Sequence, residues 1–452
     1  MTVFPTLSSK WHRIGLPCVA CAALLGACVE PDPILQGARE DVRAVLQNPD
    51  VATQTAPEST GNQSRPIALP AASTNANWTQ TVGSPGTRVA HPALRATPQL
   101  VWSANIGQGD SRKQRITADP VVSDGRVFTL DAEALLTATS TSGATLWSTD
   151  LRPARDKEGE ATGGGVVVAD GTVYASLGYG VLAAVDAANG VVRWTQQLDA
   201  TASGAPTVAG DLVYVTSGDD TGWAVNRSDG RVRWQINASD DASNVLGAPA
   251  PAISGDLAVF AFGSGEVQGV FRQGGLNRWD ASVLGKRPGR ALSSISDVTS
   301  APVISGDTVY VGNQSGRIVA LGLASGARRW TAREGAVGPV WPAGDSVFAV
   351  TDLNELVRLD ATDGSRIWGV ELPNYVKRKP RRQSRIVPHN GPIIAGARVY
   401  VASGDGLLRS FDPTNGAALG TVEIAGGATT APVVAGGTLY VVSSKGQLLA
   451  YR

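Results

Sequence analysis

Cysteine is nearly absent from this 452-residue chain, because its three cysteines, at positions 18, 21 and 28, all lie within the first 28 residues. The rest of the chain can therefore form no internal disulfide, no cysteine metal cluster and no cysteine nucleophile. An excess of either charge is also lacking, since 39 Lys and Arg residues balance 39 Asp and Glu residues. This balance excludes a nucleic-acid-binding protein that acts through bulk positive charge.

Histidine is scarce too, and only His91 and His389 lie beyond the first 28 residues. A histidine-based catalytic triad or a metal site with several histidine ligands is therefore not expected. Three carboxylates in predicted turns, Asp352, Glu355 and Asp405, leave a carboxylate-only hydrolase as an alternative. Turn-forming polar residues are the simpler interpretation, so we predict no catalytic residue, no metal site and no cofactor.

The first 27 residues have the organisation of an export signal. Lys10 and Arg13 precede an apolar run of about 14 residues, which is shorter than the ~20 residues that span a bilayer. The run ends in Leu25-Gly26-Ala27-Cys28, which resembles the lipobox of bacterial lipoproteins. This resemblance implies cleavage before Cys28 and acylation of Cys28, for example with palmitate. Val29, in place of Asp, implies transfer to the outer membrane; a plain secretory signal is the alternative.

The segment after the signal has the composition of a linker. Residues 28–77 are rich in Pro, Ser, Thr, Asn and Ala and show no sustained hydrophobic periodicity. Such a segment favours a flexible tether. We therefore predict a signal peptide over 1–27, a lipidated cysteine and tether over 28–77, and a folded domain over 78–452.

The folded domain is an internal repeat. Tryptophans spaced 47, 40, 45, 51 and 38 residues apart are each preceded by a glycine four residues earlier. The pairs are Gly143/Trp147, Gly190/Trp194, Gly230/Trp234, Gly275/Trp279, Gly326/Trp330 and Gly364/Trp368. Gly416 continues the series, but Gly420 stands where the next Trp is expected. Short Asp-Gly or Gly-Asp turns run in phase with these pairs and indicate eight units of about 45 residues.

Each unit has the pattern of four short strands. In one unit, strands are expected at 301–304, 308–311, 317–323 and 327–331, separated by turn residues. Eight such units predict an all-β fold, an eight-bladed β-propeller of four-stranded antiparallel blades. A solenoid is the structural alternative, but it needs polar caps. The last unit lacks its fourth strand, and we predict that a strand at 99–104 pairs with it and closes the ring.

This repeat resembles that of the quinoprotein-like (PQQ-like) propellers over residues 99–452. The lipobox, the tether, the single propeller and the segments Asn77-Trp78-Thr79-Gln80 and Val101-Trp102 resemble the BamB family. That resemblance implies a non-enzymatic lipoprotein of the machinery that inserts β-barrels, on the periplasmic face of the outer membrane. It implies binding to the POTRA domains of BamA, association with other barrel-assembly subunits, and contact with unfolded outer-membrane proteins.

The same resemblance implies which connectors between blades bind the partner. In the family, one connector carries a Ser-Asp-Val stretch, matched here by Ser296, Asp297 and Val298, with Thr299 at the place of a second acid. The other is matched only by position, at Val245, Leu246 and Gly247, where the Arg of the family stretch is absent. Small residues required by a tight connector are the alternative interpretation of both.

Topology separates two faces of such a propeller. The turns between the first and second and between the third and fourth strands share one face, which the turn aspartates make acidic. The connectors share the other face, with long insertions at 151–165, 280–299 and 372–390. The third insertion carries six basic residues, which are expected to contact an anionic surface or an acidic partner unless they form only a solvated loop. They are Lys377, Arg378, Lys379, Arg381, Arg382 and Arg385.

Two other functions stay open from the sequence. A periplasmic quinoprotein-type (PQQ-dependent) dehydrogenase would share the repeat, although the adjacent cysteines of many such enzymes are absent and no spacing identifies a Ca²⁺ site. A propeller lipoprotein with a different periplasmic partner is the other alternative, because a few loop residues decide the partner. Nucleic acid is not an expected partner of an exported protein.

Overall fold

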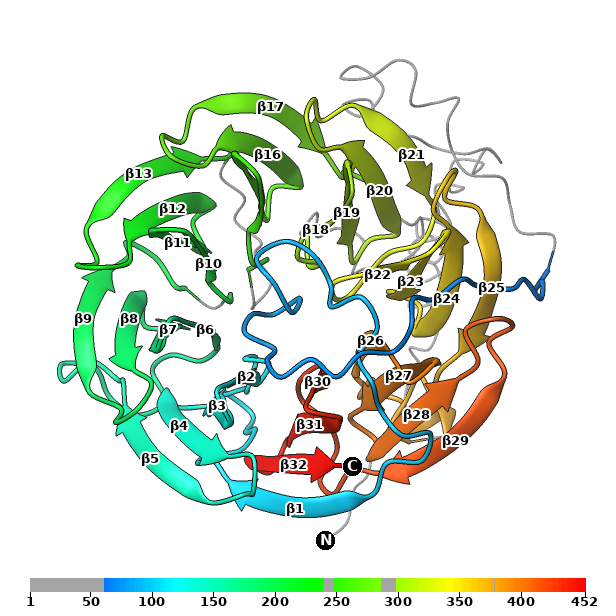
Figure 1. Cartoon of the computed structure of the whole chain (residues 1–452), viewed down its shortest axis with the longest axis horizontal. Coiled ribbons are helices and arrows are strands. Elements are labelled where there is room, and N and C mark those ends of the chain that lie inside the picture. Colours follow the sequence, from blue (N-terminus) through cyan, green and yellow to red (C-terminus); the bar gives the residue numbers. More distant parts are fainter. Residues whose placement is uncertain (1–60, 203, 240–247, 286–297, 378) are drawn as a thin grey trace, which may run out of the picture. The chain divides into compact units, whose positions relative to one another are not determined.

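The computed structural model describes residues 61–202, 204–239, 248–285, 298–377 and 379–452. Eight sheets of four antiparallel strands follow one another around a ring (Figure 1). The predicted all-β, eight-bladed propeller is therefore confirmed.

The strands are grouped by blade. Blades one to three are β2 (Val121–Ser123), β3 (Arg126–Leu130), β4 (Leu135–Ser140), β5 (Thr145–Asp150); β6 (Gly164–Ala169), β7 (Thr172–Leu177), β8 (Val181–Asp186), β9 (Val192–Gln197); β10 (Thr207–Ala209), β11 (Leu212–Thr216), β12 (Thr221–Asn226), β13 (Val232–Asn237). Blades four to six are β14 (Ala252–Ser254), β15 (Leu257–Ala261), β16 (Glu266–Phe271), β17 (Asn277–Ser282); β18 (Val303–Ser305), β19 (Thr308–Asn313), β20 (Arg317–Gly322), β21 (Arg328–Ala332); β22 (Trp341–Ala343), β23 (Ser346–Val350), β24 (Glu355–Asp360), β25 (Arg366–Glu371). Blade seven is β26 (His389–Ala395), β27 (Arg398–Ser403), β28 (Leu407–Phe411) and β29 (Ala418–Glu423), preceded by the short 3₁₀ helix η3 (Pro380–Arg382). Blade eight is β30 (Val433–Ala435), β31 (Thr438–Ser443), β32 (Gln447–Tyr451) and β1 (Leu100–Asn105).

Blade eight closes the ring with strands from the two ends of the domain. β1 pairs with β32 in antiparallel register, with Ala104 opposite Leu448 and Asn105 opposite Gln447. The predicted ring closure is confirmed, and the pairing covers two sheet edges that would otherwise be free to bind other strands.

The two-residue turns follow from residues that tolerate positive φ. Asp124 and Gly125, between β2 and β3, have φ of 50° and 73°, which is the type I′ geometry that matches the twist of a hairpin. The middle strands of each blade are buried on both faces, whereas fourth strands such as β9 and β13 alternate exposed and half-buried residues. The apolar core therefore lies between blades, as in the cluster that joins the strands of blades one and two.

The Gly/Trp repeat joins each blade to the next. The indole N–H of each fourth-strand Trp donates to a carbonyl in the following blade's turn between the third and fourth strands, for example Trp330 to Ala361 at 2.9 Å and Trp368 to Pro413 at 3.1 Å. The glycine of that turn lies against the ring, because a Cβ at Gly364 would come within 2.5 Å of Trp330. Each glycine therefore accommodates the Trp of the blade before it.

This contact also explains why the series stops at Gly420. The strand that carries Gly420, β29, faces blade eight, whose third and fourth strands, β32 and β1, are not joined by a turn. A Trp at this position would have no turn carbonyl and no glycine to receive it.

We expect Gly364→Ala to destabilise the protein more than Gly306→Ala. Both glycines have positive φ, 75° at Gly364 and 59° at Gly306, so each substitution costs about 1 kcal/mol in backbone strain. Only Gly364 adds a clash with Trp330, since nothing lies within 4 Å of a Cβ at Gly306, and a further ~1–3 kcal/mol is expected. Chemical denaturation of the two variants measures the difference; equal losses would contradict a packing role for this glycine.

The segment before β1 runs around the centre of the ring. Residues 73–92, in blue in Figure 1, contact the innermost strand, or the turn or connector beside it, in every blade. The contacts are Trp78 with Val122, Thr79 with Val168, Gln80 with Val208, Pro85 with Ile253, Gly86 with Ile304, Arg88 with Val340, Pro92 with Gly396, and Asn75 with Gly436. We call residues 73–92 the central segment; it ties all eight blades together from inside.

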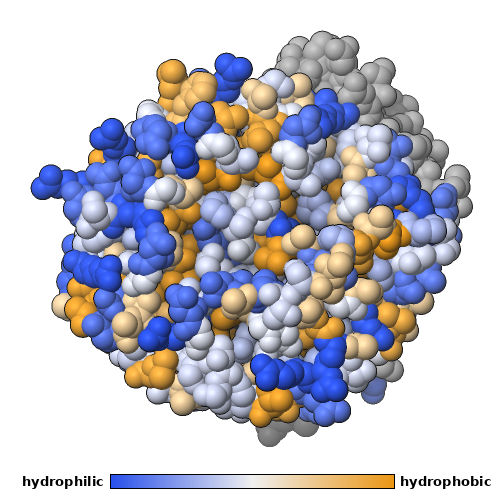
Figure 2. All heavy atoms as spheres, viewed as in Figure 1, coloured by the Kyte–Doolittle hydropathy of each residue, from blue (hydrophilic) through white to orange (hydrophobic). Residues whose placement is uncertain are grey.

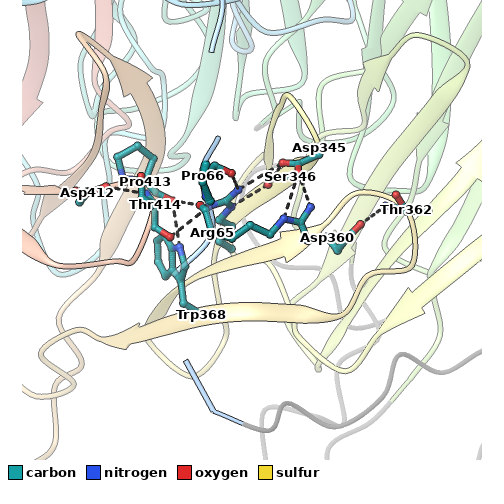
Figure 3. A network of polar contacts seen from close by, with 11 residues as sticks. Arg65, Pro66, Asp345, Ser346, Asp360, Thr362, Trp368, Asp412, Pro413 and Thr414 are labelled. Atoms are coloured by element: carbon teal, nitrogen blue, oxygen red, sulfur yellow. Dashed lines mark hydrogen bonds and ion pairs between the residues drawn. The ribbon is translucent and has the colours of Figure 1, made fainter. Parts of the chain in front are cut away.

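A second contact fixes the chain before the central segment. The buried Arg358 of β24 donates to the carbonyl of Pro66 at 3.0 Å, to the carbonyl of Pro413 at 3.1 Å and to Ser346 Oγ at 2.8 Å. Arg65 forms ion pairs with Asp345 and Asp360 (Figure 3). Burial lowers the pKa of Arg358, and the charge of Asp345 opposes that shift.

These contacts change the expected start of the folded domain. The sequence predicts a tether over 28–77, but residues 62–77 hydrogen-bond to blades six, seven and eight, as in the bond from Gln63 N to the carbonyl of Ile367. The packed part of the described chain therefore begins before residue 78. Cys28 and the rest of the predicted signal and tether, residues 1–60, lie outside the described residues.

Candidate partner-binding face

The connectors between blades and the turns between second and third strands share one face, which we call the connector face. Hydrogen bonds join the connectors to these turns: Val283 N donates to the carbonyl of Gly265 at 2.9 Å, and Leu372 N donates to that of Asn354 at 2.8 Å. The other two sets of turns share the opposite face, the turn face, where Leu323 N donates to the carbonyl of Asp307 at 2.8 Å. The predicted division into two faces is confirmed.

The turn face is less acidic than the sequence predicts. Arginines from neighbouring turns and strands neutralise several of its aspartates, as in Arg227 with Asp170 at 2.9 Å and Arg329 with Asp307 at 2.6 Å. These arginines are distant in sequence from their partners, so the turn dipeptides alone did not show the pairing. Hydrophilic and hydrophobic residues are intermixed over the molecular face in Figure 2, with hydrophilic residues frequent at the rim.

Most residues expected to bind the partner lie outside the described part of the chain. These are Val245, Leu246 and Gly247 in one connector and Ser296 and Asp297 in the other. Val298 is described, and it differs from the expectation of a partner contact: its side chain is only 2% exposed and packs with Val283 and Ile304. Thr299 Oγ1 donates to the carbonyl of Ala336 at 2.9 Å. Val298 and Thr299 therefore anchor the end of the connector to the propeller.

The basic connector is a hairpin on the connector face. Tyr375 pairs with Ile386 in an antiparallel bridge, and Val376 N donates to the carbonyl of Arg385 at 3.0 Å. The described basic residues of the predicted set, Lys377, Lys379, Arg381, Arg382 and Arg385, are all exposed, and Arg378 lies outside the described residues. The sequence predicted the basic residues but not the hairpin, because the pairing of so short a segment depends on where blades six and seven hold its ends.

A cavity of about 180 Å³ lies at the centre of the ring, between the central segment and the connectors. Arg88 and Asp119 line it, and both residues are half-buried. Burial lowers the pKa of Arg88 to about 10 and raises the pKa of Asp119 to about 6, and in each case the charge of the other opposes the shift. The sequence did not predict this proximity, because the central segment and the connector before β2 line one cavity only once the ring closes.

Both charged side chains form hydrogen bonds with backbone groups. Arg88 donates to the carbonyls of Val340 at 3.1 Å and Pro339 at 2.6 Å, with its guanidinium 4.9 Å from the centre of the Trp341 ring. Asp119 Oδ1 accepts the N–H of Ala431 at 2.8 Å. Arg88 therefore fixes the central segment to the connector before β22, and Asp119 fixes the connector before β2 to the one before β30.

His389 lies at the rim of the same cavity. Its Nε2 is 2.9 Å from the carbonyl of Pro373 and its Nδ1 is 2.7 Å from Ser403 Oγ. A carbonyl only accepts, so Nε2 carries the proton and neutral Nδ1 accepts from the hydroxyl. Burial lowers the pKa of His389.

This shift predicts a dependence of stability on pH. Because the unfolded imidazole binds a proton near pH 6.5 and the folded one only at lower pH, the unfolding free energy is unaffected above that pH and decreases as the pH falls toward the folded pKa. His389→Gln retains a donor for the Pro373 carbonyl and should remove this decrease. Denaturation of both proteins between pH 5 and 8, about the range in which histidine titrates, measures it; parallel profiles would contradict the prediction.

The carboxylates considered for hydrolysis have structural partners. Glu355 forms an ion pair with Arg366 at 3.0 Å, and Asp405 forms one with Arg409. Asp352 Oδ1 accepts the N–H of Gly335 at 3.0 Å. Within the described ranges, no group of three or more His, Cys, Asp or Glu side chains is placed to hold a metal ion.

No helix among the described residues is long and apolar enough to cross a membrane. The model of the family described as "Outer membrane protein assembly factor BamB" matches residues 132–370 and 376–452, which is more than half of the chain. Two similar curated proteins are the outer membrane protein assembly factors BamB of Shewanella oneidensis, 25% identical over 370 residues, and of Escherichia coli K12, 24% identical over 357 residues. The first alignment covers 79% of this chain and 90% of the relative, and the second covers 77% and 88%.

Solved structures with the same fold include BamB from Moraxella catarrhalis, with a TM-score of 0.62 and 18% identity over 79% of this chain and 98% of that one. The quinohemoprotein alcohol dehydrogenase from Comamonas testosteroni also has a TM-score of 0.62, with 14% identity over 84% of this chain and 81% of that one. At these identities both likenesses concern the fold alone. The family match, which spans the repeat from the first blade to the C-terminus, is the finding that assigns the sequence: the chain belongs to the outer membrane protein assembly factor BamB family.

Proposed function

We propose that this protein is a non-enzymatic scaffold of the machinery that assembles β-barrel proteins in the outer membrane. It is anchored there through acylated Cys28, on the periplasmic side, and it binds the POTRA domains of a BamA-type partner. The observation that carries the proposal is the family match over residues 132–370 and 376–452. The connector face supports it, because the longest insertions of the propeller are collected there.

The proposed mechanism is rigid presentation of binding loops by an anchored body. The central segment and the Trp contacts hold the eight blades in one ring, so the connectors have fixed ends. The lipid anchor confines the propeller to the membrane of its partner and raises the effective concentration of both. Exposed fourth strands such as β13 and β29 also offer edges to which unfolded barrel segments can add by β-augmentation.

The test is purification of the tagged, full-length lipoprotein from detergent-solubilised native membranes, with mass spectrometry of the proteins that accompany it. We expect stoichiometric BamA, which is lost in Asp297→Arg, and an acylated N-terminal peptide that begins at Cys28. The matched control is Asp256→Arg, which makes the same change in the exposed turn between β14 and β15 on the turn face and should keep BamA.

The outcomes separate the parts of the proposal. BamA that stays bound to Asp297→Arg would place the interface elsewhere. BamA that is absent from the wild-type preparation, while other barrel-assembly subunits stay together, would overturn the proposed function.

A further inference from the structure

The hairpin of the connector between β25 and β26 carries uncompensated positive charge. Residues 372–388 contain no Asp or Glu. None of its five described basic residues, Lys377, Lys379, Arg381, Arg382 and Arg385, forms an ion pair with another described residue. This differs from the turn face, where Arg227 and Arg329 are paired with aspartates.

Apolar side chains are exposed beside these charges. Tyr375 and Ile386 are 43% and 55% exposed, and Val376 is 52% exposed. Tyr375 and Ile386 are directly opposite each other in the bridge, and side chains of opposite residues lie on the same face of an antiparallel pair. The hairpin therefore presents an aromatic and an aliphatic side chain together, next to its basic residues.

We propose that this hairpin binds anionic phospholipid headgroups at the membrane surface. Lysine and arginine are attracted to the negative surface potential of such a bilayer, and a tyrosine beside an aliphatic residue suits the boundary between headgroups and acyl chains. An acidic protein surface would also attract the charges, and the experiment below distinguishes it from a membrane. The inference rests on the proposed location at the membrane and does not depend on binding to BamA.

The contact would also restrict how the propeller lies on the membrane. One acylated cysteine leaves the domain free to rotate, whereas a second attachment on the connector face brings that face toward the bilayer. The described residues that follow β13 and β17 share this face, where Ala238 N donates to the carbonyl of Asp220 and Val283 N to that of Gly265, so the lipid contact would hold these ends of the connectors near the membrane.

The test is hydrogen–deuterium exchange of the full-length lipoprotein reconstituted into two kinds of vesicle. One contains phosphatidylcholine only, and the other contains phosphatidylcholine and phosphatidylglycerol. We expect backbone amides of residues 375–387 to exchange several-fold more slowly on the anionic vesicles, and the protection to weaken as salt is added.

Two variants with the same loss of charge make the result specific. Arg381→Gln, Arg382→Gln and Arg385→Gln together should abolish the protection. Arg95→Gln, Arg231→Gln and Arg233→Gln together remove three exposed arginines outside the hairpin and should leave it unchanged.

Equal exchange on the two kinds of vesicle would overturn the inference. Protection that appears only when purified POTRA domains are added, and on both kinds of vesicle, would also overturn it and assign the hairpin to a protein contact. Neither result affects copurification of BamA with the wild-type protein, so failure of this inference is distinguishable from failure of the proposed function.

Discussion

Trp78→Ala is expected to lower the free energy of unfolding by ~3–5 kcal/mol, the range for removing a buried aromatic side chain. The Trp78 side chain is 1% exposed, and its ring lies 6.2 Å from that of Trp341, centre to centre. Its backbone exchanges two hydrogen bonds with Val122, at 2.8 and 2.7 Å. The substitution therefore opens a cavity where the central segment joins the innermost strands of blades one and six.

The matched variant is Trp78→Phe. The indole Nε1 of Trp78 has no hydrogen-bond partner among the described residues, so the phenyl ring loses volume but no hydrogen bond. We expect a loss of about 1–2 kcal/mol. Chemical denaturation followed by tryptophan fluorescence and circular dichroism measures both. A loss below about 1 kcal/mol for Trp78→Ala would show that the central segment does not contribute to the stability of the ring.

Arg358→Ala is expected to cost about 3–5 kcal/mol, as for removing one member of a buried charged network. Arg358 has no exposed side-chain surface, and its loss leaves the carbonyls of Arg65 and Pro66 without their donor. An unsatisfied buried carbonyl costs more than the hydrogen bond itself contributes. Arg358→Lys should restore little, because a single ammonium cannot reproduce the planar set of donors.

Arg65→Ala is the control for that prediction. Arg65 pairs with the same Asp345, but its side chain is 33% exposed, so we expect a loss of about 1 kcal/mol or less. Denaturation midpoints of the two variants are compared at one pH. Equal losses would contradict the view that the buried arginine, and not the surface ion pair, holds the segment in place.

The surface part of this network is expected to weaken in acid. Burial alone would raise the pKa of Asp345 and Asp360, but hydrogen bonds from Arg65 and from neighbouring donors, together with the charge of Arg65, outweigh it and hold the pKa of both below the usual range. A carboxyl with a lowered folded pKa stabilises the protein above its unfolded pKa, near 4, and this contribution is lost as the pH falls through the folded value. The difference between wild type and Arg65→Ala should therefore shrink below about pH 4.

The repeat made the blades predictable, because the alternation of β-formers and turn residues is local. The Gly/Trp phase also predicted where each unit ends, and the orphan strand with Trp102 predicted ring closure. Local patterns cannot show which distant residues a side chain meets. The contact between Gly364 and Trp330, the arginine partners of the turn aspartates and the buried position of Val298 all depend on how neighbouring blades pack.

The sequence by itself determined the strand pattern, the number of blades and the two faces of the propeller, since each follows from residue spacing that recurs eight times. Only the tertiary structure decided that residues 62–92 pack against the ring, because a segment without periodicity gives no sign of the carbonyls and N–H groups that it will meet. The position of Arg88 and Asp119 at one cavity and the bridge between Tyr375 and Ile386 have the same origin. They join positions whose separation is set by the closed ring, and no spacing along the chain encodes that distance.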